Sequence, residues 1–161
     1  MTYSTNNIAF TAPVNPPGST PVLTRDQVWA GFLIKIRSAE TFVPAGIQST
    51  SVISQSIDQN GNPVTVREVI FREDQRKAKE TVTAYKNSRI DFVQPDGSLI
   101  SNILSEGAGG ELFMTYAFEW RHPGASSEEL DAFNVKERRL SRMAVEGTIA
   151  AMRELATKGE I

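Results

Sequence analysis

Cysteine is absent from this sequence, and histidine occurs once, at His122. The lack of thiols excludes disulfides, thiolate metal sites and cysteine nucleophiles. A metal site with a single histidine would need several converging carboxylates, and no spacing in the sequence provides them. We therefore expect neither a metal nor a cofactor. We interpret His122, which lies beside Pro123 at the end of a strand, as a loop residue.

Long apolar runs and an excess of one charge are also missing. No segment approaches the roughly 20 apolar residues that cross a bilayer, so membrane insertion is not expected. The 17 Lys and Arg residues nearly balance 19 Asp and Glu, for a net charge of -2, and this balance does not favour nucleic-acid binding. Residues 1–7 are polar and lack the basic start and apolar core of a secretory signal, so a cytoplasmic location is expected.

One domain accounts for the whole length of 161 residues. We place this domain at residues 8–161, after a flexible segment over residues 1–7.

Near the end of the domain, Glu137 interrupts a group of basic residues and indicates a solvated helix face rather than a nucleic-acid patch. These basic residues are Lys136, Arg138, Arg139 and Arg142.

Capping boxes predict the starts of two helices. Thr24 and Gln27 can exchange side-chain and backbone hydrogen bonds ahead of an apolar stretch with helical spacing, and Ser126 and Glu129 can do the same near the C-terminus. A short helical turn is expected over residues 38–42. The C-terminal helix is amphipathic. Its expected apolar stripe comprises Leu130, Phe133, Leu140, Ala144, Thr148, Ala151 and Leu155.

Strand-like segments separated by turn signals fill most of the region between the two helices. Asn60-Gly61 predicts a tight hairpin, because both turn positions need positive φ. Short turns favour antiparallel pairing throughout. The expected strands cover residues 8–14, 47–57, 64–72, 77–86, 88–93, 98–106 and 111–121.

Three segments carry a resemblance to a known superfamily: Leu23–Trp29, Arg67–Phe71 and Thr115–Trp120. The expected order of elements, a strand, two short helices, six strands and a long helix, resembles that of the START-like, pollen-allergen-like (SRPBCC) helix-grip superfamily. Within this superfamily, the three segments resemble a small fungal and bacterial family of unknown function. The resemblance implies an α+β fold in which a curved seven-stranded antiparallel sheet grips the C-terminal helix around an apolar cavity. Members bind lipids, sterols or polyketides, and some cyclise, dehydrate or isomerise them.

Arg67 and Glu68 are the first candidates for chemistry. Alternation places Glu68 on the more aliphatic face of its strand, with Val64, Val66 and Ile70, and Arg67 on the other. A carboxylate in an apolar cavity has a raised pKa and can act as a general acid or base. The alternative is a structural ion pair between Glu68 and a basic residue on a neighbouring strand.

The last strand offers two faces to a cavity. The bulky face carries Leu112, Met114, Tyr116, Phe118 and Trp120, and we expect it to form the core because large apolar residues prefer burial. Glu119 then faces outward. With the opposite face inside, Glu119 lines the cavity beside the smaller Thr115 and Ala117.

Polar strand residues and a low-relief patch on the last helix are candidate ligand contacts. Tyr85, Tyr116 and Asn102 can orient a carbonyl or hydroxyl in a cavity, or can hydrogen-bond within the fold instead. A glycine inside a helix, such as Gly147, lowers helix stability by about 1 kcal/mol relative to alanine. One interpretation is that the backbone or a ligand approaches closely at Gly147, and the alternative is that Gly147 simply faces solvent. Ala144 and Thr148 flank it in the same patch.

These residues define the functional hypothesis. The domain binds a polyketide- or terpenoid-like molecule and promotes its cyclisation, dehydration or isomerisation, with Glu68 transferring protons. The ligand contacts are Arg67, Tyr85, Asn102, Tyr116, Glu119, Ala144, Gly147 and Thr148. The alternative is a non-catalytic carrier of a hydrophobic ligand, and a third hypothesis is an interaction module in which the cavity is incidental.

Overall fold

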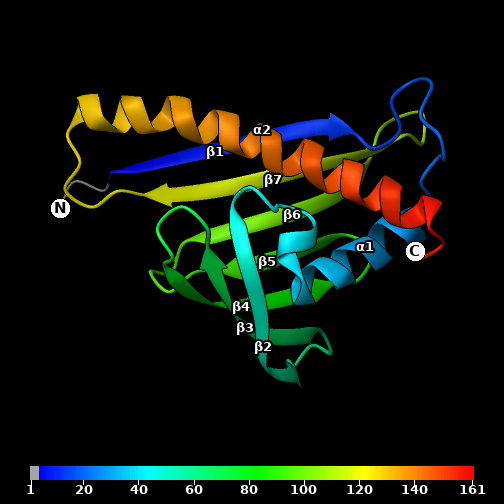
Figure 1. Cartoon of the computed structure of the whole chain (residues 1–161), viewed down its shortest axis with the longest axis horizontal. Helices are drawn as coiled ribbons and strands as arrows, with labels where there is room; N and C mark the ends of the chain where they lie inside the picture. The colour runs from blue at the N-terminus through cyan, green and yellow to red at the C-terminus, as the bar shows by residue number, and fades with distance from the viewer. Residues whose placement is uncertain (1–3) are drawn as a thin grey trace.

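The computed structural model describes residues 4–161 and contains one sheet, two α-helices and a short 3-10 helix (Figure 1). In chain order the elements are β1 Thr5–Pro13, α1 Arg25–Arg37, η1 Ala39–Thr41, β2 Ile47–Ile57, β3 Pro63–Phe71, β4 Lys77–Tyr85, β5 Arg89–Val93, β6 Leu99–Glu106, β7 Leu112–Arg121 and α2 Ser127–Thr157. The expected order of elements is confirmed.

The sheet has seven strands in the order β1-β7-β6-β5-β4-β3-β2, and every neighbouring pair is antiparallel. The long helix α2 lies along β1 and β7, and its C-terminal half also contacts α1 (Figure 1). β2 is therefore at the edge of the sheet farthest from β1. This arrangement is the helix grip that the sequence predicts.

The first strand begins earlier than predicted. Thr5, Asn6 and Asn7 pair with Arg121, Trp120 and Glu119 at the end of β7. The prediction of a flexible segment over residues 1–7 is therefore wrong for residues 5–7, because these polar residues satisfy their backbone groups in the sheet. The part of that prediction that concerns residues 1–3 lies outside the described residues.

Local signals set the element boundaries. Both capping boxes form: the Thr24 and Ser126 side chains accept from the N–H groups of Gln27 and Glu129, whose side chains accept in return from the cap N–H groups. A hairpin joins β2 and β3 around Asn60-Gly61, but the predicted two-residue turn is wrong. Ile57 pairs with Pro63, so the loop is longer, and of the two residues only Gly61 has positive φ, at 84°.

The core lies between the inner face of the sheet and the two helices. Val28, Phe32, Met114, Val145 and Met152 are fully buried there. The helices approach closely at Gly31, where a Cβ atom would stand 2.8 Å from Met152 Cγ. No helix in the described part of the chain is both long and apolar enough to cross a membrane.

The buried stripe of α2 differs from the predicted one. Thr148 and Leu155 are buried as expected, but Phe133 is 40% exposed, and the stripe runs instead through Glu137, Ser141, Val145, Ile149 and Met152. The N-terminal half of α2 thus buries polar residues and its C-terminal half apolar ones. The prediction that Glu137 lies on a solvated face is wrong, because partners on β1 and after β7 satisfy its carboxylate.

Candidate functional site in the helix grip

The structure reverses the expected roles of the two faces of β3. Arg67 is buried with Thr65 and Val69, whereas Glu68 is half-exposed on the outer face, opposite Ser51 and Lys79 in the register. The prediction that Glu68 lines the interior is therefore wrong. The aliphatic residues on the same face as Glu68 remain outside, because the inner face provides hydrogen-bond partners for the Arg67 guanidinium.

Arg67 receives those partners from two other elements, β4 and α1. Its Nε lies 2.9 Å from Glu80 Oε1 across the β3–β4 ladder, and its Nη1 donates to the carbonyls of Lys35 and Ile36 at 2.9 and 3.0 Å. The last carbonyls of a helix lack partners within the helix, so a guanidinium is well suited to them. Arg67 thus fixes the end of α1 above the inner face of the sheet.

Lys35 brings a second buried cation to the same place. Its Nζ lies 4.6 Å from the centroid of the Tyr116 ring and 5.2 Å from that of Phe92. Burial, followed by the charge of Arg67, lowers the pKa of Lys35 from 10.5 to about 7, although Glu80 opposes the shift. The sequence analysis missed this residue because it looks like an ordinary residue of an amphipathic helix.

Asn102 is a buried polar side chain without a hydrogen-bond partner in the described part of the chain. It is fully buried on β6 between Ile90 and Tyr116 in the register, and neither its amide nitrogen nor its oxygen has a hydrogen bond among residues 4–161. An unsatisfied buried polar group costs about 1–3 kcal/mol. The position of Asn102 in the interior agrees with the sequence-based expectation.

Tyr116 and Thr148 connect the sheet to α2 beside Asn102. The Tyr116 hydroxyl lies 2.8 Å from Thr148 Oγ1, and both residues are buried. Burial raises the pKa of Tyr116 well above its ordinary value. Lys35, Arg67, Asn102, Tyr116 and Thr148 together line the inner side of the grip, and we call them the interior polar cluster.

Four other predicted site residues lie outside this cluster. Tyr85 is on the outer face of β4, under the guanidinium of Arg89 at 4.0 Å from the ring centroid. Glu119 is on the outer face of β7 and accepts from the Leu99 N–H at 3.0 Å, so the bulky face of β7 is the core face, as expected. Gly147 lies near η1, where a Cβ atom would stand 3.4 Å from the Phe42 carbonyl, and Ala144 is half-buried nearby.

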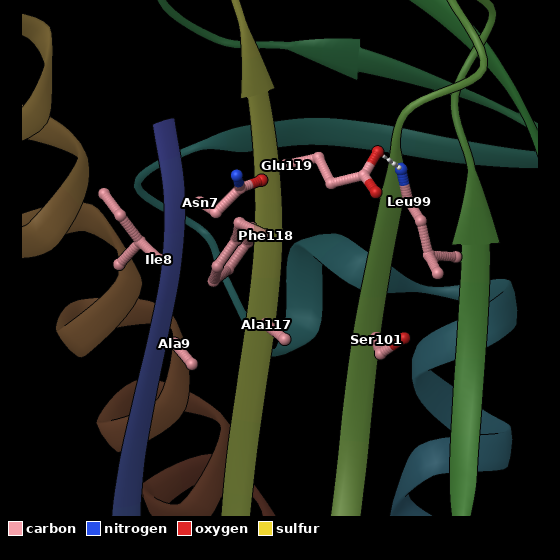
Figure 2. A pocket seen from close by; sticks show the side chains of 8 residues that line it. All are labelled: Asn7, Ile8, Ala9, Leu99, Ser101, Ala117, Phe118 and Glu119. Atoms are coloured by element: carbon pink, nitrogen blue, oxygen red, sulfur yellow. Dashed lines mark hydrogen bonds between the residues drawn. The ribbon is translucent and has the colours of Figure 1, made fainter. Parts of the chain in front are cut away.

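The surface has a depression of about 310 Å³ on the side of the sheet away from α2. Its lining includes Asn7, Ala9, Ser101, Ala117 and Glu119 (Figure 2). A second depression of about 250 Å³ lies beside α1, at Leu33, Ile34, Arg37 and Ser38. Neither lies between the sheet and α2, so the predicted apolar cavity remains a prediction. The unsatisfied amide is in the interior, and we therefore place the candidate site there.

A second polar group lies beneath the N-terminal half of α2. Glu137 is buried, accepts from Asn6 Nδ2 at 3.0 Å and is hydrogen-bonded to His122 Nε2. The His122 ring stacks on Phe133 with centroids 4.1 Å apart. His122 does follow the last strand, but the sequence did not predict its partner, because the contact joins residues 15 positions apart on different elements.

Comparisons with known proteins agree with this architecture. Residues 8–159 match the family described as AtaL, acetylaranotin biosynthesis cluster protein L. No curated protein matches the sequence significantly.

Among solved structures, the chain resembles Ara h 8.0201 with a TM-score of 0.52 and 14% identity, over 96% of this chain and 99% of that one. It resembles StfQ, the di-domain ARO/CYC of the steffimycin biosynthetic pathway, with a TM-score of 0.62 and 8% identity; the match covers 96% of this chain and 52% of StfQ. It also resembles an AHSA1-like protein from Aeromonas hydrophila with a TM-score of 0.50 and 12% identity, over 97% and 96% of the two chains. At these identities the likeness supports the START-like, pollen-allergen-like fold alone.

Proposed function

The chain belongs to the family of acetylaranotin biosynthesis cluster protein L, and we propose that it binds a polyketide-like molecule within the helix grip and promotes its cyclisation. Asn102 would anchor a ligand oxygen, and Lys35 would transfer protons. The family description places its members in secondary-metabolite biosynthesis, and the resemblance to the ARO/CYC protein StfQ supports a polyketide-like ligand.

The unpaired amide of Asn102 is the observation that carries this proposal. Its Nδ2 and Oδ1 are buried without hydrogen-bond partners in residues 4–161, on the strand beside the one that carries Tyr116. A carbonyl or enol oxygen of a ligand would accept from Nδ2 and remove the energetic cost of the unpaired group. Ligand entry would separate part of α2 from the sheet, and the N-terminal half of α2 is the part that buries polar rather than apolar residues.

Lys35 is suited to the chemical step. With a pKa of about 7, its amine is partly neutral at physiological pH and can act as a general base. The neutral amine would take a proton from the carbon between two carbonyls. The resulting enolate carbon would bond to the carbon of a further, more distant carbonyl in the same molecule. The oxygen of that carbonyl would receive the proton from the Lys35 ammonium. The product is a cyclic isomer of the substrate, which can then lose water.

One observation favours the carrier alternative. The Lys35 ammonium lies over the Tyr116 and Phe92 rings, a contact that stabilises a cation without any chemistry. In a carrier, Lys35 would only shape the interior and Asn102 would still bind the ligand. The two functions therefore share Asn102 and differ at Lys35.

Binding can be tested with a hydroxylated anthraquinone followed by absorbance and by thermal shift. Asn102→Leu should weaken binding about tenfold through the lost hydrogen bonds, and should raise the melting temperature because no unpaired amide remains. Glu68→Gln is the matched control on the outer face and should change neither property. Equal binding by wild type and Asn102→Leu would overturn the proposal.

Turnover can be tested with a linear tetraketide that has carbonyls on alternate carbons and cyclises slowly without catalyst. The wild-type protein should accelerate cyclisation, and Lys35→Met should lose the acceleration while still binding the anthraquinone. Equal rates for the two proteins would favour the carrier.

A further inference from the structure

Trp120 is the second residue with an unpaired polar atom in the interior. Its indole Nε1 is buried and has no hydrogen-bond partner among residues 4–161. Trp120 lies on the inner face of β7, where its ring stacks on Phe118 with centroids 5.3 Å apart, and Phe118 in turn contacts Tyr116 at 6.2 Å. An aromatic row thus runs along β7 from Tyr116 to Trp120.

The two unpaired groups lie at opposite ends of this row. Asn102 is opposite Tyr116 in the β6–β7 register, and Trp120 is four residues further along β7. At about 3.3 Å per residue, these positions are about 13 Å apart along the strand. An indole N–H can only donate, so its partner must be an acceptor such as a carbonyl or hydroxyl oxygen.

The part of α2 beside the Asn6–Trp120 strand pair is held by polar contacts. Asn6, which is opposite Trp120 on β1, donates to the Leu130 carbonyl and to Glu137 Oε2, each at 3.0 Å. His122 bonds to the other oxygen of Glu137. The fully buried apolar residues of α2 begin only at Val145. A flat ligand can therefore replace contacts over Phe118 and Trp120 without displacing the apolar part of the core.

We infer that the ligand is elongated and flat, stacks along the Tyr116–Trp120 row, and has an oxygen acceptor at each end, one bound by Asn102 and the other by the Trp120 indole N–H. This inference rests on the proposed function and adds to it the shape and polarity of the ligand. His122 and Glu137 position Trp120 indirectly, because they fix α2 to β1 around it.

The chain has two tryptophans, Trp29 and Trp120, which provides a matched pair of variants. Trp29 is in α1 with its ring edge-on to Phe32, away from the row. Trp120→Phe retains an aromatic ring and removes the N–H, and Trp29→Phe leaves Trp120 as the single indole fluorophore. The probes are an anthraquinone with one hydroxyl on each outer ring and its analogue with a hydroxyl on one outer ring only.

Wild type and Trp29→Phe should bind the two-hydroxyl quinone about fivefold to tenfold more tightly than the analogue, the effect of one hydrogen bond. Trp120→Phe should lose this preference yet bind the analogue unchanged. In Trp29→Phe, the quinone should quench the remaining indole emission. The inference is overturned if Trp120→Phe still prefers the two-hydroxyl quinone, or if the quinone does not quench the emission of Trp29→Phe. The proposed function stands in either case, provided that Asn102→Leu still weakens binding. Failure of both quinones to bind wild type would overturn both.

Discussion

The Tyr116 hydroxyl and Thr148 Oγ1 are 2.8 Å apart in the interior, and this contact joins the centre of β7 to α2. Both side chains are buried, so water cannot replace the bond when it is lost. The bond also holds the Tyr116 ring beneath the Lys35 ammonium. One contact therefore links the stability of the grip to the geometry of the proposed site.

Removal of this bond should destabilise the fold. Tyr116→Phe should lower the free energy of unfolding by about 1–2 kcal/mol, because Thr148 is left unpaired in the core. Urea denaturation followed by circular dichroism measures the change. Tyr85→Phe on the outer face is the control and should have a much smaller effect. In a double-mutant cycle with Thr148→Val, a coupling energy near zero would show that the two hydroxyls do not interact.

Lys35 should make stability depend on pH. Its folded pKa of about 7 is below its unfolded value of 10.5, so between these values the unfolded chain binds more protons and the stability due to this group rises with pH. The rise approaches about 1.4 kcal/mol per pH unit. Lys35→Met, which cannot titrate, should be more stable than wild type near pH 7, and its advantage should shrink toward pH 10. Parallel melting curves for the two proteins across this range would contradict the lowered pKa.

The buried pair of Arg67 and Glu80 should be far more sensitive than the exposed Glu68. Arg67→Met removes the ion-pair partner of the Glu80 carboxylate and leaves two α1 carbonyls unpaired, and should cost about 3–5 kcal/mol of unfolding free energy. The double variant Arg67→Met/Glu80→Leu should recover part of the loss, because both charges of the buried pair are removed together. Glu68→Gln should change stability by less than about 0.5 kcal/mol. A loss of unfolding free energy for Glu68→Gln as large as that for Arg67→Met would contradict this prediction. It would mean that the half-exposed Glu68 carboxylate supports the fold as much as the buried pair does.

The two glycines inside helices should respond to alanine in opposite directions. At Gly31 the new methyl group would collide with Met152 Cγ, so Gly31→Ala should destabilise by about 1–3 kcal/mol. At Gly147 the methyl group would only touch the Phe42 carbonyl, so Gly147→Ala should stabilise by about 0.5–1 kcal/mol through helix propensity. Thermal melts of the two variants provide the comparison. Stabilisation by Gly31→Ala would mean that α1 and α2 leave room for a methyl group at Gly31, and destabilisation by Gly147→Ala would mean that the Phe42 carbonyl leaves none at Gly147; either result would contradict the prediction.

Some candidate site residues could be found from the sequence because burial follows alternation. Tyr116 and Asn102 fall on inner faces of their strands, and the bulky face of β7 is the core face. The same reasoning failed for Glu68, because the more aliphatic face of β3 is not the buried one. What decides that face is the pairing of Arg67 with Glu80 and with the end of α1, and these partners come from other elements.

The sequence by itself determined the starts of the helices and the order and antiparallel pairing of the elements, because capping boxes and strand alternation act over a few residues, as at Thr24 and Gln27. Only the tertiary structure decided which polar groups meet. Lys35 approaches Tyr116 and His122 bonds to Glu137 because elements far apart in the chain pack together. The same packing leaves polar atoms of Asn102 and Trp120 without hydrogen-bond partners among the residues that the structure describes. Contacts of this kind depend on strand register and helix placement, which no local pattern encodes.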